Sequence, residues 1–289
     1  MDLKNQYSDD SFVIFLHIQK TAGMTLQRYL RKQFGPGLVR RIWWKISKDP
    51  RIDGDVVTAA RARRKSDGFF AGHFAFGMHE NLPKPATYMA FFREPVSRVI
   101  SLYKHSKNDE GSYYHEFAKN QDLRGFVTES GLMELDNGMV RFLCGEPGEY
   151  FINRVPVGSV DDAMLKKAIE NFDRYFFFGG IQEMFDESFL LLAQKLGDTD
   201  PKYLTLNVAK PNAGQPFDDE TKEMIRRSNA YDMTLYDHVK RRFERELAEA
   251  FPDLDQRLDR LQTANTAYNG RTKTLNRMKI AINRNRAGN

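Results

Sequence analysis

Two short segments of the chain combine basic and hydroxyl side chains with turn residues, which is the chemistry of an anion site. The first runs from Gln19 to Thr25 with the sequence QKTAGMT, and the second runs from Arg93 to Ser101 with the sequence REPVSRVIS. Lysine and arginine supply positive charge, and threonine and serine supply hydroxyl donors. An arginine of this kind suits a bidentate contact to phosphate. Each segment alone also fits a structural turn, with the arginine paired to an acid.

Both segments lie where a strand is predicted to end and a helix to begin. Residues 12–18, FVIFLHI, form an apolar run typical of a strand buried on both faces, and residues 24–34 carry apolar side chains at helical spacing. Residues 88–92 predict a second strand, and Pro95 suits the first position of the next helix. Free backbone N–H groups and the helix dipole at such a helix start favour a bound anion.

The remaining pattern predicts the fold class. A third strand is expected at 175–179 and a helix at 182–196, whereas 108–157 is expected to be helical in pieces and to cap one end of the sheet. Residues 218–261 follow a helical pattern throughout. Strands that alternate with helices indicate an α/β fold, with a mainly parallel sheet flanked by helices and a helical C-terminal part.

Charge divides the chain into a body and a tail. We expect a single domain over residues 1–264 and a basic tail over residues 265–289, because no linker or repeat interrupts the body. The tail has no acidic residue, and its basic residues are Arg271, Lys273, Arg277, Lys279, Arg284 and Arg286. The body is nearly neutral, so nucleic acid is not an expected partner. The tail is interpreted as a solvated terminus, with peripheral membrane contact as the alternative.

Cysteine and acidic residues give no sign of a metal centre. Cys144 is the only cysteine, which excludes an intrachain disulfide and a cysteine metal cluster and fits a reducing compartment. The acids at Asp161 and Asp218 are interpreted as charges at helix N-termini.

The first apolar run, at 12–18, is too short for a signal sequence or a membrane span. We therefore expect a cytoplasmic, metal-free protein.

Taken together, the two anion segments resemble the donor motifs of sulfotransferases that use 3′-phosphoadenosine-5′-phosphosulfate (PAPS). The first is similar to the 5′-phosphosulfate loop and the second to the 3′-phosphate motif, with the family's spacing of Arg93 and Ser101. Four further matches follow in order: GHFAFGMH (72–79), LDNGMVR (135–141), FGGIQEMFDES (178–188) and NAYDMTLY (229–236). The resemblance covers residues 12–245 and is to the carbohydrate type, sulfotransferase family 2, which includes heparan sulfate 2-O-sulfotransferases and bacterial relatives.

The resemblance implies a P-loop-like nucleotide-binding sulfotransferase fold, PAPS as donor, and 3′-phosphoadenosine-5′-phosphate (PAP) as product. The implied donor-binding residues are Gln19, Lys20, Thr21, Ala22, Gly23, Met24, Thr25, Arg93 and Ser101. Three of them depart from the family pattern: Gln19 stands for proline, Ala22 for glycine and Met24 for threonine. The implied acceptor is a hydroxyl of a glycan or glycolipid, with a peptide tyrosine as the alternative. A P-loop-like kinase or nucleotide-binding protein is the other alternative, although Walker A spacing is missing.

Histidines and tryptophans complete the candidate site. The resemblance implies His73 as general base and Lys20 as the catalytic cation, and a neutral imidazole with a pKa near 6.5 suits proton removal from a hydroxyl. His79 is the rival base or a substrate contact, and His17 is interpreted as a core or supporting histidine. Trp43 and Trp44 fit either an acceptor surface or ordinary surface packing.

Overall fold

The structure is a computed structural model that describes residues 12–21, 23–34, 41–42, 69–82, 85–145, 155–204 and 217–287. The strands are β1 (Phe12–Leu16), β2 (Arg41–Ile42), β3 (Phe69–Gly72), β4 (Ala86–Phe92) and β5 (Phe176–Ile181). The helices are α1 (Gly23–Phe34), α3 (Pro95–Asn108), α4 (His115–Ala118), α5 (Leu123–Glu129), α6 (Gly138–Leu143), α7 (Asp162–Tyr175), α8 (Phe185–Lys195), α9 (Asp219–Ser228), α10 (Ala230–Ala250) and α11 (Leu254–Ala287). Short 3₁₀ helices are η2 (Met78–Asn81), η3 (Met133–Leu135) and η5 (Gln182–Met184).

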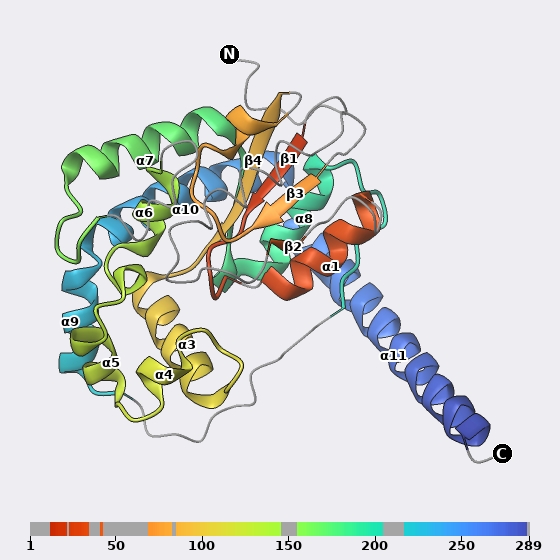
Figure 1. The fold of residues 1–289 in the computed structure, drawn as a ribbon. Coiled ribbons are helices and arrows are strands. Elements are labelled where there is room, and N and C mark those ends of the chain that lie inside the picture. Colours follow the sequence, from red (N-terminus) through yellow and green to blue (C-terminus); the bar gives the residue numbers. More distant parts are fainter. Residues whose placement is uncertain are drawn as a thin grey trace.

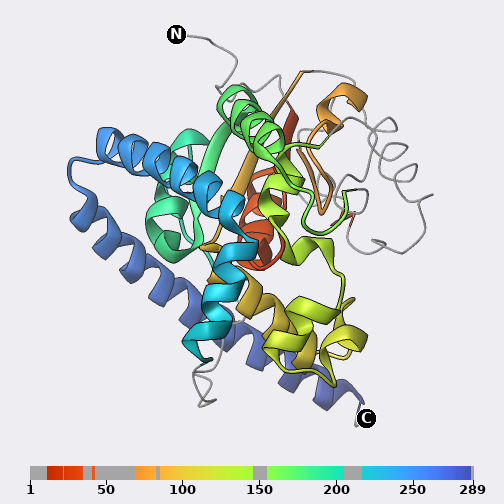
Figure 2. The same ribbon diagram turned by 90° about the vertical axis from the view of Figure 1, so that its left-hand side faces the viewer.

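The five strands form one parallel sheet in the order β2-β3-β1-β4-β5 (Figure 1). Helices α7 and α10 cover one face of the sheet, and α1 and α8 cover the other (Figures 1 and 2). Every residue of β1 is buried, as expected for a strand that is covered on both faces. The predicted α/β class, with its mainly parallel sheet and helical C-terminal part, is confirmed.

Strand order places a crevice between β1 and β4. After β1 the chain continues toward β2 and β3 on one side, whereas β4 leads to β5 on the other. Such a reversal of winding leaves room for a ligand beyond the carboxyl ends of the two strands. β1 and β3 end level, because Leu16 pairs with Gly72, whereas β4 continues past Met89, the partner of Phe15, to Phe92.

Element boundaries differ from the predicted ones by small shifts. β1 ends at Leu16 instead of residue 18, and β5 covers 176–181 instead of 175–179. The predicted helix at 182–196 is divided into η5 and α8. The acids interpreted as helix-start charges do begin helices, since Asp161 accepts from the Met164 N–H (2.9 Å) and Asp218 from the Thr221 N–H (2.7 Å).

Helices α3, α4, α5 and α9 gather at one end of the molecule around a second apolar core (Figure 1). Val99, Phe126 and Ile225 are fully buried in this core. Of residues 108–157, which were expected to cap one end of the sheet, α4 and α5 pack against α3, and α6 packs against α7 and α10. Residues 146–154 lie outside the described structure.

A buried polar network joins α6 to the start of α10. Asn137, in the left-handed region at φ 52°, accepts from the backbone N–H groups of Tyr231 (3.0 Å) and Asp232 (3.1 Å). In return, the Asp232 carboxylate accepts from the N–H groups of Met139 (2.9 Å) and Val140 (2.8 Å) in the first turn of α6. Each helix start is thus satisfied by a side chain from the other motif, 135–141 or 229–236.

Helix α11 begins on the body and then extends away from it (Figure 1). Leu261 is buried, and Asn265 accepts from the Tyr203 N–H (2.9 Å). Residue 265, where the basic tail is expected to begin, therefore lies inside a continuous helix, and the side chains of the six basic tail residues lie outside the described structure. Within the described ranges, no helix is both long and apolar enough to cross a bilayer.

Candidate active site

Three segments that are far apart in the sequence meet beyond the carboxyl edge of the sheet. The loop after β1 carries Lys20, the residue after β3 is His73, and the residue after β4 is Arg93. Because β1 lies between β3 and β4, these three residues follow adjacent strands. The sheet therefore brings together Lys20 and Arg93, one from each predicted anion segment, and His73, the predicted base.

The loop between β1 and α1 is a tight turn with a positive-φ lysine. Lys20 adopts φ 68°, and the buried Thr21 donates its hydroxyl proton to the Ile18 carbonyl (2.7 Å). In this structure the Thr21 hydroxyl thus closes the turn. α1 then begins at Gly23 with no acidic residue in its first turn, and the buried Thr25 lies in that turn. Its backbone N–H groups and positive dipole end suit an anion.

Arg93 bridges the two predicted anion segments. Its Nη1 donates to the Lys20 carbonyl oxygen (3.2 Å), and its Nε lies 3.9 Å from Glu183 Oε1. That Nε atom is buried and has no hydrogen-bond partner within the described part of the chain. Glu183 is itself held by the Glu94 N–H (3.1 Å) and the Tyr236 hydroxyl (3.0 Å). Arg93 is therefore fixed in place and keeps one buried donor for an anion.

Burial and a neighbouring cation make this edge of the sheet favourable for negative charge. Burial and the charge of Arg93 lower the pKa of Lys20, and burial lowers the pKa of Arg93 against the opposing effect of Glu183. A partly buried lysine beside an arginine is disfavoured in its charged form, and a bound anion relieves that repulsion. The electrostatics therefore fit an anionic ligand in the crevice between β1 and β4.

Ser101 is half-buried in the second turn of α3. It precedes His105 by one helical turn, so the two side chains share a face. Burial and the charge of Lys20 lower the pKa of His105. Glu94 caps the same helix by accepting from the N–H groups of Val96 (3.1 Å) and Ser97 (2.7 Å).

His73 is buried and its tautomer is defined by one short hydrogen bond. Its Nδ1 lies 2.6 Å from the carbonyl oxygen of His17, so Nδ1 must carry the proton that is donated. In the neutral ring the lone pair is then on Nε2, the atom that a general base uses. Burial lowers the pKa of His73 to about 4, which corrects the expected value near 6.5.

His79 lies in η2, within the same connection between β3 and β4 as His73, but its contacts are with the side of the sheet. Its Nδ1 and its backbone N–H contact the Tyr88 hydroxyl at 2.9 Å and 3.0 Å, and its ring packs against Phe76 and Tyr175. Tyr88 pairs with Ile14, near the middle of β1, whereas His73 follows the residue paired with Leu16. His79 is thus held in an aromatic cluster beside the sheet, away from its carboxyl edge.

The other predicted residues divide into described and undescribed ones. Gln19 is half-buried in the turn after β1, and Gly23 is the first residue of α1. The backbone of Met24 belongs to α1, but its side chain lies outside the described structure. The residues that lie wholly outside it are Ala22, Trp43 and Trp44.

Two further positions support the site. His17, interpreted as a core or supporting histidine and placed in the strand, instead follows β1, and its ring stacks on the ring of His73 at 4.3 Å. Glu183, which holds Arg93, lies inside the motif quoted at 178–188 and was not given a role. The signal for Glu183 was its motif, and the signal for His17 was its position directly before the first anion segment.

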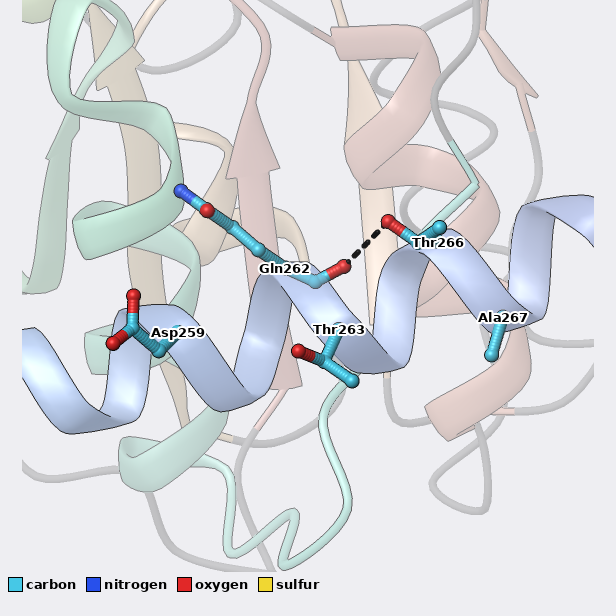
Figure 3. A pocket seen from close by; sticks show the side chains of 5 residues that line it. All are labelled: Asp259, Gln262, Thr263, Thr266 and Ala267. Carbon is cyan, nitrogen blue, oxygen red and sulfur yellow. Dashed lines mark hydrogen bonds between the residues drawn. The ribbon is translucent and has the colours of Figure 1, made fainter.

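A surface hollow lies apart from the candidate site residues. A shallow hollow on α11 is formed by exposed side chains, shown in Figure 3: Asp259, Gln262, Thr263, Thr266 and Ala267. None of the candidate site residues lines it. Among the described residues, no group of three or more His, Cys, Asp or Glu side chains gathers in a metal-binding arrangement.

Comparisons with known proteins find sulfotransferases. Residues 4–276 match the model of the galactose-3-O-sulfotransferase family. The human heparan-sulfate 6-O-sulfotransferase 1 is 24% identical over 295 residues, which covers 84% of this chain and 68% of the relative. The heparan-sulfate 6-O-sulfotransferase 2 of Gallus gallus is 24% identical over 284 residues, covering 80% of this chain and 66% of the relative. The solved sulfotransferase of Alicyclobacillus acidocaldarius is 14% identical, with a TM-score of 0.43, over 81% of this chain and 96% of that one.

Proposed function

Because the chain belongs to the galactose-3-O-sulfotransferase family, we propose that it transfers a sulfuryl group from PAPS to a carbohydrate hydroxyl. The observation that carries the proposal is the contact between the two anion segments, where Arg93 donates to the Lys20 carbonyl (3.2 Å) in the crevice between β1 and β4. PAPS has anionic groups at both ends of its nucleoside. A pair of linked anion sites at one sheet edge suits such a donor.

The 5′-phosphosulfate is assigned to the first turn of α1. Lys20 supplies a full charge there, and the backbone N–H groups at the start of the helix supply oriented donors. The 3′-phosphate is assigned to Arg93 and Ser101. Arg93 keeps a buried Nε donor, and Ser101 is half-buried in the second turn of α3.

His73 is proposed as the general base. With the proton of its neutral ring on Nδ1, its Nε2 accepts the acceptor hydroxyl proton as the new bond between oxygen and sulfur forms. The bond between sulfur and the bridging phosphate oxygen breaks, and its electron pair leaves on PAP. Lys20 and the N–H groups of the first turn stabilise the charge that develops on that oxygen.

The acceptor is proposed to be a glycan or glycolipid hydroxyl, with a peptide tyrosine as second choice. The matched relatives carry heparan sulfate in their names, and the family is named for galactose, so each points to a sugar hydroxyl. These names specify sulfuryl transfer to 3-O and 6-O positions of a sugar. The similarity to 2-O-sulfotransferases therefore stays a prediction.

Calorimetry with PAP and AMP tests the donor assignment. PAP is expected to bind more tightly, because only PAP carries the 3′-phosphate that Arg93 and Ser101 would contact. Equal affinities would contradict the proposal. Turnover of labelled PAPS with a panel of sugars then identifies the acceptor, and activity that survives EDTA would separate this reaction from Mg²⁺-dependent phosphoryl transfer.

A further inference from the structure

The ring of His17 lies between the proposed base and the start of the donor-binding helix. On one side it stacks on the His73 ring, with centroids 4.3 Å apart and planes at 27°. Its Nε2 end covers Gly23, because a Cβ at that position would lie 1.8 Å from His17 Nε2, and Phe15 also stacks on the ring at 5.1 Å. A side chain at position 23 and the His17 ring therefore cannot occupy their places together.

His17 is also held by both its backbone and its ring nitrogen. Its backbone N–H donates to the Gly72 carbonyl (2.9 Å), and its carbonyl accepts from His73 Nδ1 (2.6 Å). Its Nδ1 lies 3.3 Å from Nε2 of the buried Gln27, one turn into α1. Because an amide nitrogen is only a donor, His17 Nδ1 accepts and the ring proton is on Nε2. One residue thus connects β1, the end of β3 and α1.

Burial disfavours a charged form of this ring. Burial, with the neighbouring His73 and Lys20, lowers the pKa of His17 well below its ordinary value. The neutral ring, which accepts at Nδ1, is therefore the form favoured near neutral pH.

We infer that His17 is a positioning residue that holds the proposed base His73 and the first turn of α1 in one fixed arrangement. The inference rests on the proposed function, in which α1 binds the sulfuryl donor and His73 removes the acceptor proton. In-line transfer needs both partners at a defined separation, and a displacement of about 1 Å can cost about 100-fold in rate. A ring that touches both groups can set that separation.

A double-mutant cycle tests the shared space. Gly23→Ala is expected to lower kcat/KM about 100-fold, because the new methyl group displaces the His17 ring. His17→Ala is expected to lower it about tenfold, and the double variant should be no worse than Gly23→Ala, because the methyl group fits the vacated space. Gly270→Ala in α11, with nothing within 4 Å of the added Cβ, is the matched control and should match wild type. Losses that multiply in the double variant would overturn the inference.

The acid limb of the pH profile separates positioning from a loss of folded protein. Burial sets the low pKa of His73, and the His17 carbonyl is its hydrogen-bond partner. His17→Ala opens the stacked face of His73 to water, so the limb should move from near pH 4 toward 6.5, whereas His17→Phe keeps a ring there and should hold it. An unmoved limb in His17→Ala would contradict the inference.

The same shift can be measured without turnover. NMR titration of the His73 imidazole in wild type and His17→Ala reports the pKa directly. If wild type shows no PAPS-dependent activity, the proposed function fails, and the titration still decides whether the His17 ring controls the environment of His73. An unchanged His73 pKa in that titration would overturn the positioning inference by itself.

Discussion

The protonation of His73 sets the pH range in which the proposed base can act. Its folded pKa of about 4 lies below the ordinary 6.5 because burial disfavours the imidazolium. A base works only when deprotonated, so its activity is lost as pH falls through the folded pKa. We therefore expect kcat/KM to be flat from pH 7 to 5 and to fall near 4. Circular dichroism at each pH checks that the protein is still folded.

Removal of the base should be visible in turnover and not in donor binding. His73→Ala is expected to lower kcat by about 100-fold or more and to abolish the acid limb, with PAP affinity nearly unchanged, because the base acts on the acceptor side of sulfur. His79→Ala is the control, since His79 is bound to Tyr88 away from the sheet edge, and its effect should be milder and confined to acceptor KM. If His79→Ala abolished turnover and His73→Ala did not, His79 would be the base and His73 the acceptor contact.

Arg93 should account for most of the difference in affinity between PAP and AMP. Arg93→Ala removes a half-buried, charge-assisted contact to the 3′-phosphate, which is expected to cost about 1.5–3 kcal/mol of PAP binding and little of AMP binding. Arg124→Ala is the matched control, because Arg124 forms an exposed ion pair with Glu220. Calorimetry with both nucleotides measures the difference. An equal loss of binding free energy for PAP and AMP would show that Arg93 contacts a part of the donor other than the 3′-phosphate.

Residue types and spacing predicted the positions of Lys20, Arg93 and His73, because each follows an apolar run and the ends of adjacent parallel strands meet. The pKa of His73 could not be predicted, since it depends on burial by residues from other elements. The contact between His17 and Gly23 was equally hidden. The sequence does not show that the His17 ring covers Gly23, because that contact depends on the position of the ring in three dimensions.

At the scale of elements, the helix starts are held by partners that are distant in sequence. Asp232, fully buried in α10, accepts from two N–H groups of α6 and lies 3.7 Å from the fully buried Arg98 of α3. Glu134 shares the same guanidinium and accepts from the Tyr114 hydroxyl (2.6 Å). The motifs 135–141 and 229–236 therefore share a packing role, because they join three helices, and Tyr236 of the second motif also holds Glu183 beside Arg93.

Asp232→Ala should destabilise the fold strongly. The change leaves Arg98 with less compensation in a buried position and removes the partner of the first N–H groups of α6, which is expected to cost about 3–5 kcal/mol of unfolding free energy. Asp237→Ala, at an exposed position of the same helix, is the control and should change little. Urea unfolding followed by circular dichroism measures both. A cost below about 1 kcal/mol for Asp232→Ala would show that the network contributes little.

Periodicity predicted elements well where one apolar run filled one element, as in β1, β4 and α3. β2 was missed because a strand of two residues, Arg41–Ile42, has no period to detect. The division of 182–196 into η5 and α8 was missed for a different reason. Ser188 bonds both the N–H (2.8 Å) and the carbonyl (3.0 Å) of Ile181, and this contact follows from packing at the end of β5.

At the scale of the whole molecule, α11 is the element that connects the body to the basic tail. Its first part packs against the body through Leu261, and Asn265 and Asn269 contact the backbone of Tyr203. The helix then continues to Ala287 without a break. The division at residue 264 therefore stays a proposal, and the contacts of Asn265 and Asn269 favour a body that ends a few residues later.

Two truncations locate that boundary. A chain that ends at residue 270 keeps Asn265 and Asn269 and should unfold like the full chain, with the same kcat. A chain that ends at residue 264 loses their hydrogen bonds to Tyr203 and should be less stable by about 1 kcal/mol or more. Thermal unfolding of the three proteins measures the difference. Equal stability of the two truncated chains would place the boundary at 264, as the charge pattern predicts.

The same proteins test what the tail binds. The segment after residue 270 has six basic and no acidic residues, so it should be attracted to anionic lipid by about 1 kcal/mol for each charge near the surface. The alternative of membrane contact through the tail predicts that the full chain sediments with vesicles that contain phosphatidylserine and not with neutral phosphatidylcholine vesicles, and that added salt weakens the binding. The chain ending at residue 270 should bind neither vesicle, and its turnover of a soluble sugar should equal that of the full chain. Equal vesicle binding by the two chains would show that the tail makes no membrane contact, because the nearly neutral body would then account for all of it.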